Sequence, residues 1–402
     1  MSFAALSAAS AAPRSDAGLK VVTLKAEGIE ASFIPYGARL TSLRVPDRTG
    51  EWREVNVGYA DAAQYHKEKG NAYFGAVVGR YANRMAHGRF TVAGETYQVT
   101  NNDHDGQNAL HGGVRGYDAR DWAVEAQTPT SVTFALADDG FEGFPGKVLV
   151  HATYTVTKGT LRVQLTALPL DKATPILLTT HAYFNLSSTL APTVLDDTLH
   201  VPQGSRVVAV DGISVPTGAV LSVSGDHPLN YTSPRAVRDG ALGAKFCGDG
   251  GVGIDNCFLF DRPEPPSSAT LGPAQVILAS KATGIRLAVH TNQPAIQLYS
   301  GNGFDGSVET QLGKAEQYGS IAIEPQGWWV EVWRHDADVT GSTRSTTPSG
   351  DTTTSTRRRA GRMSTLPSMC LARCPRARRS SGWGLGVVFS GWDSKMRRMA
   401  PA

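Results

Sequence analysis

The 402-residue sequence has few cysteines, no long apolar run and little helical periodicity. Its four cysteines are scattered, and the pair Cys370 and Cys374 has no second pair to match it, which excludes a disulfide scaffold and most zinc modules. No run of 18 apolar residues occurs, so a membrane-spanning helix is excluded. With 41% hydrophobic and 19% charged residues, the composition is typical of a soluble globular protein with a sizeable core.

Charge is distributed unevenly along the chain. The formal net charge is +3, but residues 329–402 hold 13 Lys and Arg against 5 Asp and Glu. Residues 1–328 hold the other 26 basic and 31 acidic residues, so the body of the protein is mildly acidic. Nucleic-acid binding is therefore not expected, except through the basic C-terminal segment.

The first 18 residues are rich in Ala and Ser. They lack the basic start and the uninterrupted apolar stretch of a secretory signal, which predicts a flexible leader on a cytoplasmic protein. A transit peptide containing Arg14 is the alternative.

Short strands account for most of the body of the chain. Apolar and polar residues alternate through residues 20–45, and Gly or Pro punctuates the alternation, as in half-buried strands. Turn residues between alternating segments predict hairpins at 89–92 with 96–99, 148–156 with 161–165, and 276–279 with 285–289. One short helix is expected near 61–69. This pattern predicts an all-β fold, a large antiparallel β-sandwich.

The composition changes after Trp328. Residues 341–402 contain 18 Ser and Thr and 12 Lys and Arg but only two acidic residues. Such a segment buries too little apolar surface to offset the entropy of ordering it, so we expect disorder. The predicted organisation is a leader at 1–18, one β-sandwich domain at 19–328, and an atypical basic tail at 329–402. The tail is either genuine or an artefact of the gene prediction.

Polar residues and glycines gather in several short segments of the body. These segments are 79–84, 110–113, 180–185, 253–256, 291–297 and 323–326. Taken singly, each has an ordinary structural explanation, such as a buried histidine at 181 or an Asx turn at 255. Together they suit a polyhydroxylated ligand, whose hydroxyls both donate and accept hydrogen bonds, and they permit acid–base chemistry. No two histidines have the local spacing of zinc ligands, so no metal is expected.

The same segments, in this order, resemble the aldose 1-epimerase (galactose mutarotase) family. The resemblance runs from about residue 20 to residue 328, and its motifs are 74–84, 110–116, 143–146, 180–186, 293–302 and 324–326. Any one motif is a weak signal, whereas all of them in one order are specific. The family fold is a large antiparallel β-sandwich, in agreement with the strand pattern.

The resemblance also implies a reaction and its residues. It implies interconversion of the α and β anomers of free hexoses, galactose and glucose, with Glu324 as general base and His181 as general acid. The residues it assigns to the sugar are Asn83, Arg84, His111, Tyr183, Asp255 and Gln297. No hydride moves and no covalent intermediate forms, so no cofactor is expected. Arg84 is expected to keep neighbouring carboxylates ionised while His181 stays protonatable.

Other functions remain open at this point. A hexose-6-phosphate 1-epimerase would need additional basic residues near the sugar's sixth carbon, and a catalytically impaired sugar-binding relative would retain the fold.

Past residue 328 the family continues with an Asp-Ala-Val-Asn-like stretch and a closing strand, which have no match here. Loss of that strand would leave a sheet edge unpaired, unless residues 387–389 replace it. The expected partner is a small aldohexose. No association with a membrane is expected, and the protein is expected to be a monomer.

Overall fold

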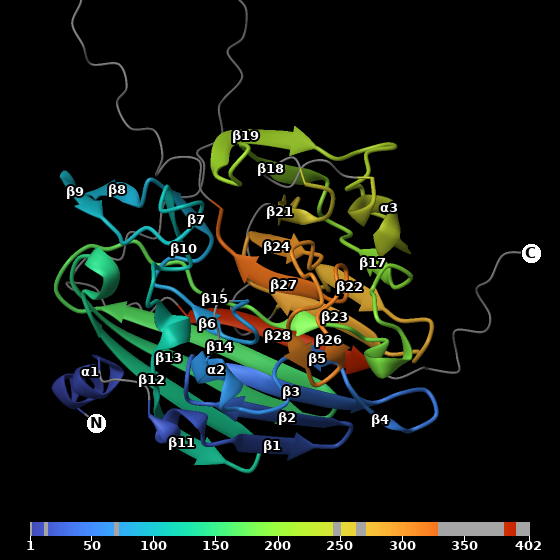
Figure 1. The fold of residues 1–402 in the computed structure, drawn as a ribbon, viewed down its shortest axis with the longest axis horizontal. Helices are drawn as coiled ribbons and strands as arrows, with labels where there is room; N and C mark the ends of the chain where they lie inside the picture. Colours follow the sequence, from blue (N-terminus) through green and yellow to red (C-terminus); the bar gives the residue numbers. More distant parts are fainter. Residues whose placement is uncertain are drawn as a thin grey trace, which may run out of the picture.

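The computed structural model describes residues 2–11, 15–67, 72–243, 251–262, 271–328 and 382–390. Antiparallel strands form most of its regular structure, so the predicted all-β sandwich is confirmed (Figure 1). A nine-stranded sheet has the order β11 (Ala123–Thr128), β12 (Ser131–Asp139), β13 (Lys147–Thr157), β14 (Thr160–Pro169), β28 (Gly382–Ser390), β23 (Arg286–Thr291), β22 (Val276–Ala279), β17 (Thr198–His200) and β20 (Arg235–Ala236). A seven-stranded sheet has the order β19 (Pro216–Ser222), β18 (Arg206–Val210), β21 (Asp255–Leu259), β24 (Ala295–Tyr299), β27 (Ile321–Gln326), β16 (Tyr183–Phe184) and β5 (Asn56–Val57).

Smaller elements surround these two sheets. A four-stranded sheet contains β1 (Val22–Ala26), β2 (Ile29–Ile34), β3 (Arg39–Pro46) and β4 (Trp52–Glu54). The two-stranded pairs are β6 (Val77–Val78) with β15 (Thr179–Thr180), β7 (Arg84–Ala86) with β10 (Asn108–Leu110), β8 (Arg89–Val92) with β9 (Glu95–Gln98), and β25 (Glu309–Thr310) with β26 (Gly313–Lys314). The helices are α1 (Phe3–Ala11), α2 (Gln64–Lys67) and α3 (Val237–Ala241), with 3-10 turns at Asp16–Leu19, Tyr117–Ala119, Phe141–Gly143 and Ser188–Leu190.

The apolar residues that alternate along the sequence are the buried residues of the strands. All three predicted hairpins form, as β8 with β9, β13 with β14, and β22 with β23. Along β13, every second side chain from Val148 to Val156 is buried, as the two-residue period of a strand requires. One apolar cluster contains side chains from all three larger sheets and forms the main core. The short helix expected near 61–69 is α2.

The leader differs from its prediction. Residues 3–11 form helix α1 rather than a flexible segment, and Leu6 is buried in a small cluster with Ala135 and Ala137 of β12. The apolar partners lie more than 120 residues away along the chain, so the local composition does not reveal them.

The tail also differs from its prediction at residues 382–390. These nine residues form β28, which pairs with β14 on one side and with β23 on the other (Figure 1). Val387 is opposite both Leu161 and Val289. Disorder is therefore the wrong prediction for this strand, because it has backbone partners on both edges. The rest of the predicted tail, 329–381 and 391–402, lies outside the described residues.

A buried ion pair joins one predicted motif to the nine-stranded sheet. The guanidinium of Arg80 contacts Asp138 at the end of β12 through Nε at 2.8 Å and Nη2 at 2.6 Å, and neither side chain is exposed. Arg80 also donates to the carbonyls of Pro145 and Gly146, and the Tyr117 hydroxyl donates to Asp138. This pair anchors the segment that continues into residues 83 and 84.

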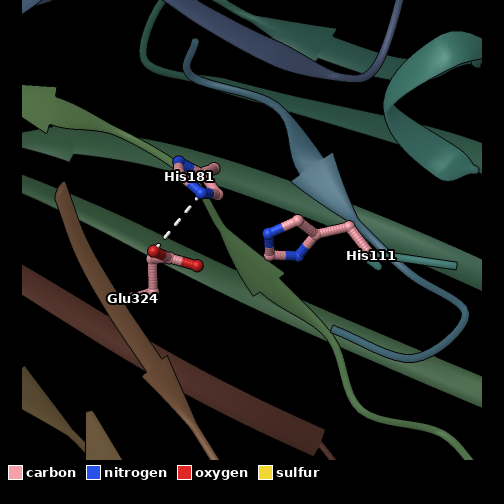
Figure 2. Close-up of side chains that lie close together, drawn as sticks. All are labelled: His111, His181 and Glu324. Atoms are coloured by element: carbon pink, nitrogen blue, oxygen red, sulfur yellow. Dashed lines mark ion pairs between the residues drawn. The ribbon is translucent and has the colours of Figure 1, made fainter. Parts of the chain in front are cut away.

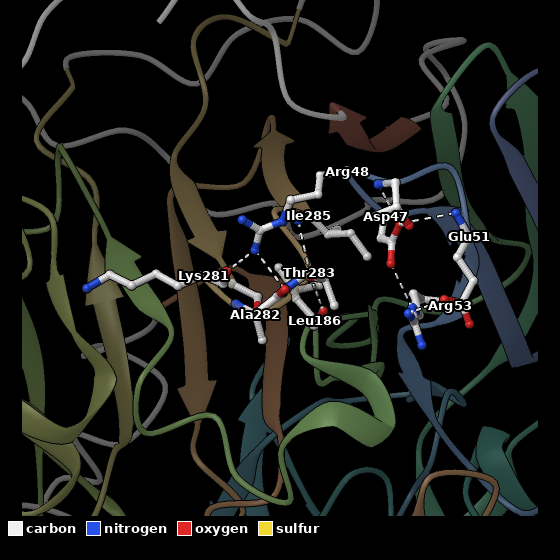
Figure 3. Close-up of polar contacts among 11 residues, drawn as sticks. Asp47, Arg48, Glu51, Arg53, Leu186, Lys281, Ala282, Thr283 and Ile285 are labelled. Atoms are coloured by element: carbon white, nitrogen blue, oxygen red, sulfur yellow. Dashed lines mark hydrogen bonds and ion pairs between the residues drawn. The ribbon is translucent and has the colours of Figure 1, made fainter. Parts of the chain in front are cut away.

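A second polar set joins the turn after β3 to the turn between β22 and β23 (Figure 3). The Arg48 guanidinium donates to the carbonyls of Lys281 and Ala282, and its backbone N–H donates to the Thr283 carbonyl at 3.0 Å. The Thr283 hydroxyl in turn donates to the Leu186 carbonyl at 2.7 Å. The contacts therefore tie the segment that follows β16 to two other sheets.

None of the helices in the described ranges combines the length and the apolar character that crossing a bilayer requires.

Replacing Asp138 tests the buried ion pair. Asp138→Ala leaves the Arg80 cation buried without its partner, so we expect the free energy of unfolding to fall by about 3–5 kcal/mol. The matched control is Asp139→Ala, because the adjacent carboxylate is half exposed and lies 3.6 Å from Lys147 in a surface ion pair. That control should cost less than about 1 kcal/mol. Chemical denaturation of the three proteins measures both values, and equal stability of the two variants would contradict the anchoring role.

Candidate active site

The candidate site occupies one face of the seven-stranded sheet. Along β24 and β27, Ile296, Leu298 and Ile323 point into the main core. The residues between them point to the opposite face, where Gln297 lies directly across from Glu324. One strand pairing therefore places a carboxamide beside a carboxylate, with an apolar layer behind them.

His181 and Glu324 form a close, buried pair (Figure 2). His181 Nε2 lies 3.3 Å from Glu324 Oε1, and their side chains are 6% and 3% exposed. The backbone of His181 is held on both sides, since its N–H donates to Ala76 and its carbonyl accepts from Gly75. Gly75 has a positive φ, and a Cβ there would lie 1.9 Å from the Leu40 carbonyl oxygen, so the close approach requires glycine.

His111 stands edge-on to His181, with ring centroids 5.1 Å apart. It follows β10 and is paired with Asn83 through two hydrogen bonds. The His111 N–H donates to the Asn83 carbonyl at 3.2 Å, and the Asn83 N–H donates to His111 Nδ1 at 3.1 Å. Because Nδ1 accepts, the neutral ring carries its proton on Nε2. His111 thus presents a hydrogen-bond donor at Nε2.

Polar side chains beside this group line a cleft that is open to solvent. Asn83 donates to Gln297 Oε1 at 3.2 Å, and Gln297 Nε2 donates to Asp255 Oδ1 at 2.6 Å. Arg84 also lines the cleft, and its Nε donates to Asp103 Oδ2 at 3.0 Å. The resulting wall offers amide, carboxylate and guanidinium groups at one surface.

Burial governs the electrostatics of the central group. It raises the pKa of Glu324 well above its ordinary value, and the nearby charge of Asp255 raises it further. Arg84 acts in the opposite direction but is the smallest of the three causes, so it does not offset the effect of burial, contrary to the expectation that Arg84 dominates this carboxylate. Burial also lowers the pKa of His181 to about 3 and holds the pKa of His111 well below its usual range.

The distances alone would allow a metal ion here. Ligand atoms of His111, His181 and Glu324 all lie within 4.8 Å of one another, although the residues are far apart in sequence. The tautomer of His111 does not fit such a role, because the Asn83 N–H occupies Nδ1 and the proton on Nε2 blocks the other nitrogen. The set is better suited to moving protons than to holding a cation.

All eight residues that the sequence singles out gather in this region. Asn83, Arg84, Asp255 and Gln297 line the cleft, and Glu324 and His111 surround His181. The Tyr183 ring lies 5.0 Å from the His181 ring. Their chemical roles remain predictions from the resemblance, whereas their proximity is now a structural fact.

Comparison with known proteins agrees with this arrangement. The family model described as aldose 1-epimerase matches residues 20–346. The chain belongs to the aldose 1-epimerase family. A protein of Arthroderma benhamiae named "Probable aldose 1-epimerase" is 40% identical over 347 residues, which cover 77% of this chain and 79% of that protein. The galactose mutarotase of Sus scrofa is 33% identical over 306 residues, covering 76% and 84%. Like these relatives, this aldose 1-epimerase family member is an isomerase.

Solved structures share the fold. An aldose epimerase homologue from C. elegans has a TM-score of 0.74 at 24% identity, covering 92% of this chain and 98% of that one. A galactose 1-epimerase from Lactobacillus acidophilus has a TM-score of 0.68 at 22% identity, covering 92% and 94%.

Sequence reasoning did not single out three residues of the candidate site. Tyr73 packs against both histidines, with its ring 4.5 Å from that of His111 and 5.5 Å from that of His181. Cys257 and Gln326 line the cleft beside Gln297. Gln326 ends a recognised motif, and Tyr73 immediately precedes another, which is the signal that was available. An aromatic residue or a cysteine among apolar neighbours otherwise indicates only a core position.

The raised pKa of Glu324 predicts how its replacement changes stability with pH. At pH 4 the carboxyl is protonated in the folded and the unfolded chain, so burial costs little. As pH rises above the ordinary value, the unfolded chain releases this proton and the folded chain does not, so the free energy of unfolding falls. Glu324→Gln does not lose stability in this way. Its free energy of unfolding should therefore exceed that of the wild type by an amount that grows from pH 4 to pH 8.

Thermal unfolding across that pH range measures the effect. Glu309→Gln, at an exposed position on β25, is the matched control and should track the wild type at every pH. A constant difference in midpoint between Glu324→Gln and the wild type from pH 4 to pH 8 would contradict the raised pKa.

Proposed function

We propose that this protein interconverts the α and β anomers of free aldohexoses, galactose and glucose among them. The observation that carries the proposal is the 3.3 Å contact between His181 Nε2 and Glu324 Oε1 beside a polar cleft. A hemiacetal has its ring oxygen and its hydroxyl oxygen on one carbon. An acid and a base that act on both oxygens must therefore lie close to each other, as these two groups do.

The reaction requires only proton transfers and one ring bond. Glu324 takes the proton of the anomeric hydroxyl while His181 donates a proton to the ring oxygen. The bond between C1 and the ring oxygen breaks, and the open chain carries an aldehyde. Rotation about the C1–C2 bond presents the other face, and the two groups then reverse their roles as the ring closes. Each transfer by a positioned group contributes about 10²–10⁴-fold.

The proton balance of the pair suits this cycle. Burial disfavours a charge on either side chain, so over a wide pH range the pair holds one proton between them. With that proton on His181, the pair is ready to open a ring. After ring opening the proton from the sugar is on Glu324, which is the arrangement that burial favours. The same single proton serves the reverse step.

The neighbouring side chains hold the sugar in this proposal. The Nε2–H of His111 would donate to the ring oxygen region, and Asn83, Arg84, Asp255 and Gln297 would bind the sugar hydroxyls. Tyr183 would form a wall against the ring. No cofactor enters any step, and a monomer in the cytoplasm remains the prediction from sequence.

The hexose-6-phosphate alternative finds no support in the cleft. Arg84 is the basic side chain among the described residues that line it, and this guanidinium is already paired with Asp103. A phosphate would need additional uncommitted cations.

Polarimetry of freshly dissolved α-D-galactose tests the proposal. The wild type should accelerate the change in rotation, and Glu324→Gln should lower kcat by about 10²–10⁴-fold because the proton acceptor is lost. Glu309→Gln, with an exposed carboxylate, should retain full activity. Undiminished activity of Glu324→Gln would contradict the role of the base. No acceleration by folded wild type would instead indicate the sugar-binding relative.

The shared proton predicts a bell-shaped dependence of kcat/KM on pH. On the acid side a second proton enters the pair, and on the alkaline side its single proton is lost, so both limbs belong to the pair. Because burial raises the pKa of Glu324 and lowers that of His181, the plateau between the limbs should be wide. A profile with no alkaline limb up to the pH where the protein unfolds would be inconsistent with one shared proton.

A further inference from the structure

Gln326 is a buried carboxamide at the cleft that the proposed reaction does not use. It lies two residues after Glu324 on β27, so both side chains project from the same face of the strand. Gln326 is 3% exposed and lines the cleft together with Cys257. Among the described residues, its Oε1 atom has no hydrogen-bond partner.

The other end of this carboxamide has only a weak partner. Gln326 Nε2 donates to Cys257 Sγ at 3.4 Å. Burial raises the pKa of Cys257 to about 12, so the group is a neutral thiol at physiological pH. A thiol is a weak donor and a weak acceptor, so either orientation of the carboxamide leaves hydrogen-bonding capacity unused. Buried polar atoms in native proteins are nearly always paired, and the position of Gln326 at the cleft makes its unused oxygen accessible to a bound ligand.

The position of Gln326 relative to Glu324 defines what this partner is. Two residues along a strand span about 7 Å, which is comparable to the width of a pyranose ring with its hydroxyls. A sugar with its anomeric carbon at Glu324 would therefore place a distant hydroxyl near Gln326. A hydroxyl both donates and accepts, as the unused groups of the carboxamide require.

We propose that Gln326 is a further substrate-binding residue, which hydrogen-bonds one hydroxyl of the sugar on the side of the ring away from the anomeric carbon. The proposal rests on the proposed function, because it takes the position of the anomeric carbon from the role of Glu324. It adds a contact at the part of the ring where aldohexoses differ from one another.

Gln326→Met removes the carboxamide with little change in volume. We expect KM for galactose to rise about five- to tenfold with kcat within about twofold of the wild type, since the lost contact is remote from the reacting atoms. Gln326→Leu provides a second apolar variant if the first does not fold. Gln293→Met is the matched control, because Gln293 is also buried with an unpaired Oε1 but does not line the cleft.

A panel of 2-, 3-, 4- and 6-deoxygalactose identifies the hydroxyl. For the sugar that lacks it, the wild type and Gln326→Met should have the same KM, while the other sugars retain the difference. An unchanged KM for galactose in Gln326→Met would overturn the proposal. So would a difference that persists equally for all four deoxy sugars.

Calorimetric titration with galactose separates this proposal from the proposed function. Absence of turnover in the wild type would refute the epimerase activity, yet a five- to tenfold weaker Kd in Gln326→Met would still support the contact. Equal Kd values in the two proteins would overturn it. Absence of any sugar binding to the wild type would refute both.

Discussion

The buried contact between Arg80 and Asp138 is the constraint on which the site depends. A charge that has been removed from water needs its partner in place, so the segment at Arg80 has one position relative to the end of β12. Asn83 and Arg84 follow within four residues, and the backbone of Asn83 in turn sets the tautomer of His111. One electrostatic requirement in the interior therefore determines the orientation of groups at the cleft.

The seven-stranded sheet contributes side chains both to the apolar core and to the polar site. One face of β24 and β27 supplies apolar side chains to the core, and the other supplies Gln297, Glu324 and Gln326 to the site. The apolar layer stabilises the fold and also removes water from behind the carboxylate. The same burial raises the pKa of Glu324 and lowers that of His181, so it disfavours a charge on either side chain. Desolvation thus links the packing of the core to the protonation of the candidate site.

Strand β28 explains how the nine-stranded sheet is continuous although the family motifs end near residue 328. It comes from a segment whose composition predicts disorder, and it pairs with β14 and β23 along most of its length. Strand pairing uses the backbone N–H and C=O groups that every residue except proline carries, so composition alone does not exclude the segment from this position. Helix α1 is a similar case, because Leu6 is ordered by distant residues of β12.

The amino-acid sequence by itself determined the fold class and the hairpins, and it singled out eight residues that the fold brings together. Alternation and turn residues are local features, and the order of motifs can be read along the chain. Sequence reasoning could therefore predict the strand at 148–156 and single out Glu324. Only the tertiary structure decided that His181 lies 3.3 Å from Glu324, that Tyr73 packs on both histidines, and that Gln326 has an unused oxygen. The physical reason is that burial, pKa and hydrogen-bond pairing depend on atoms far apart in the chain, which no local pattern records.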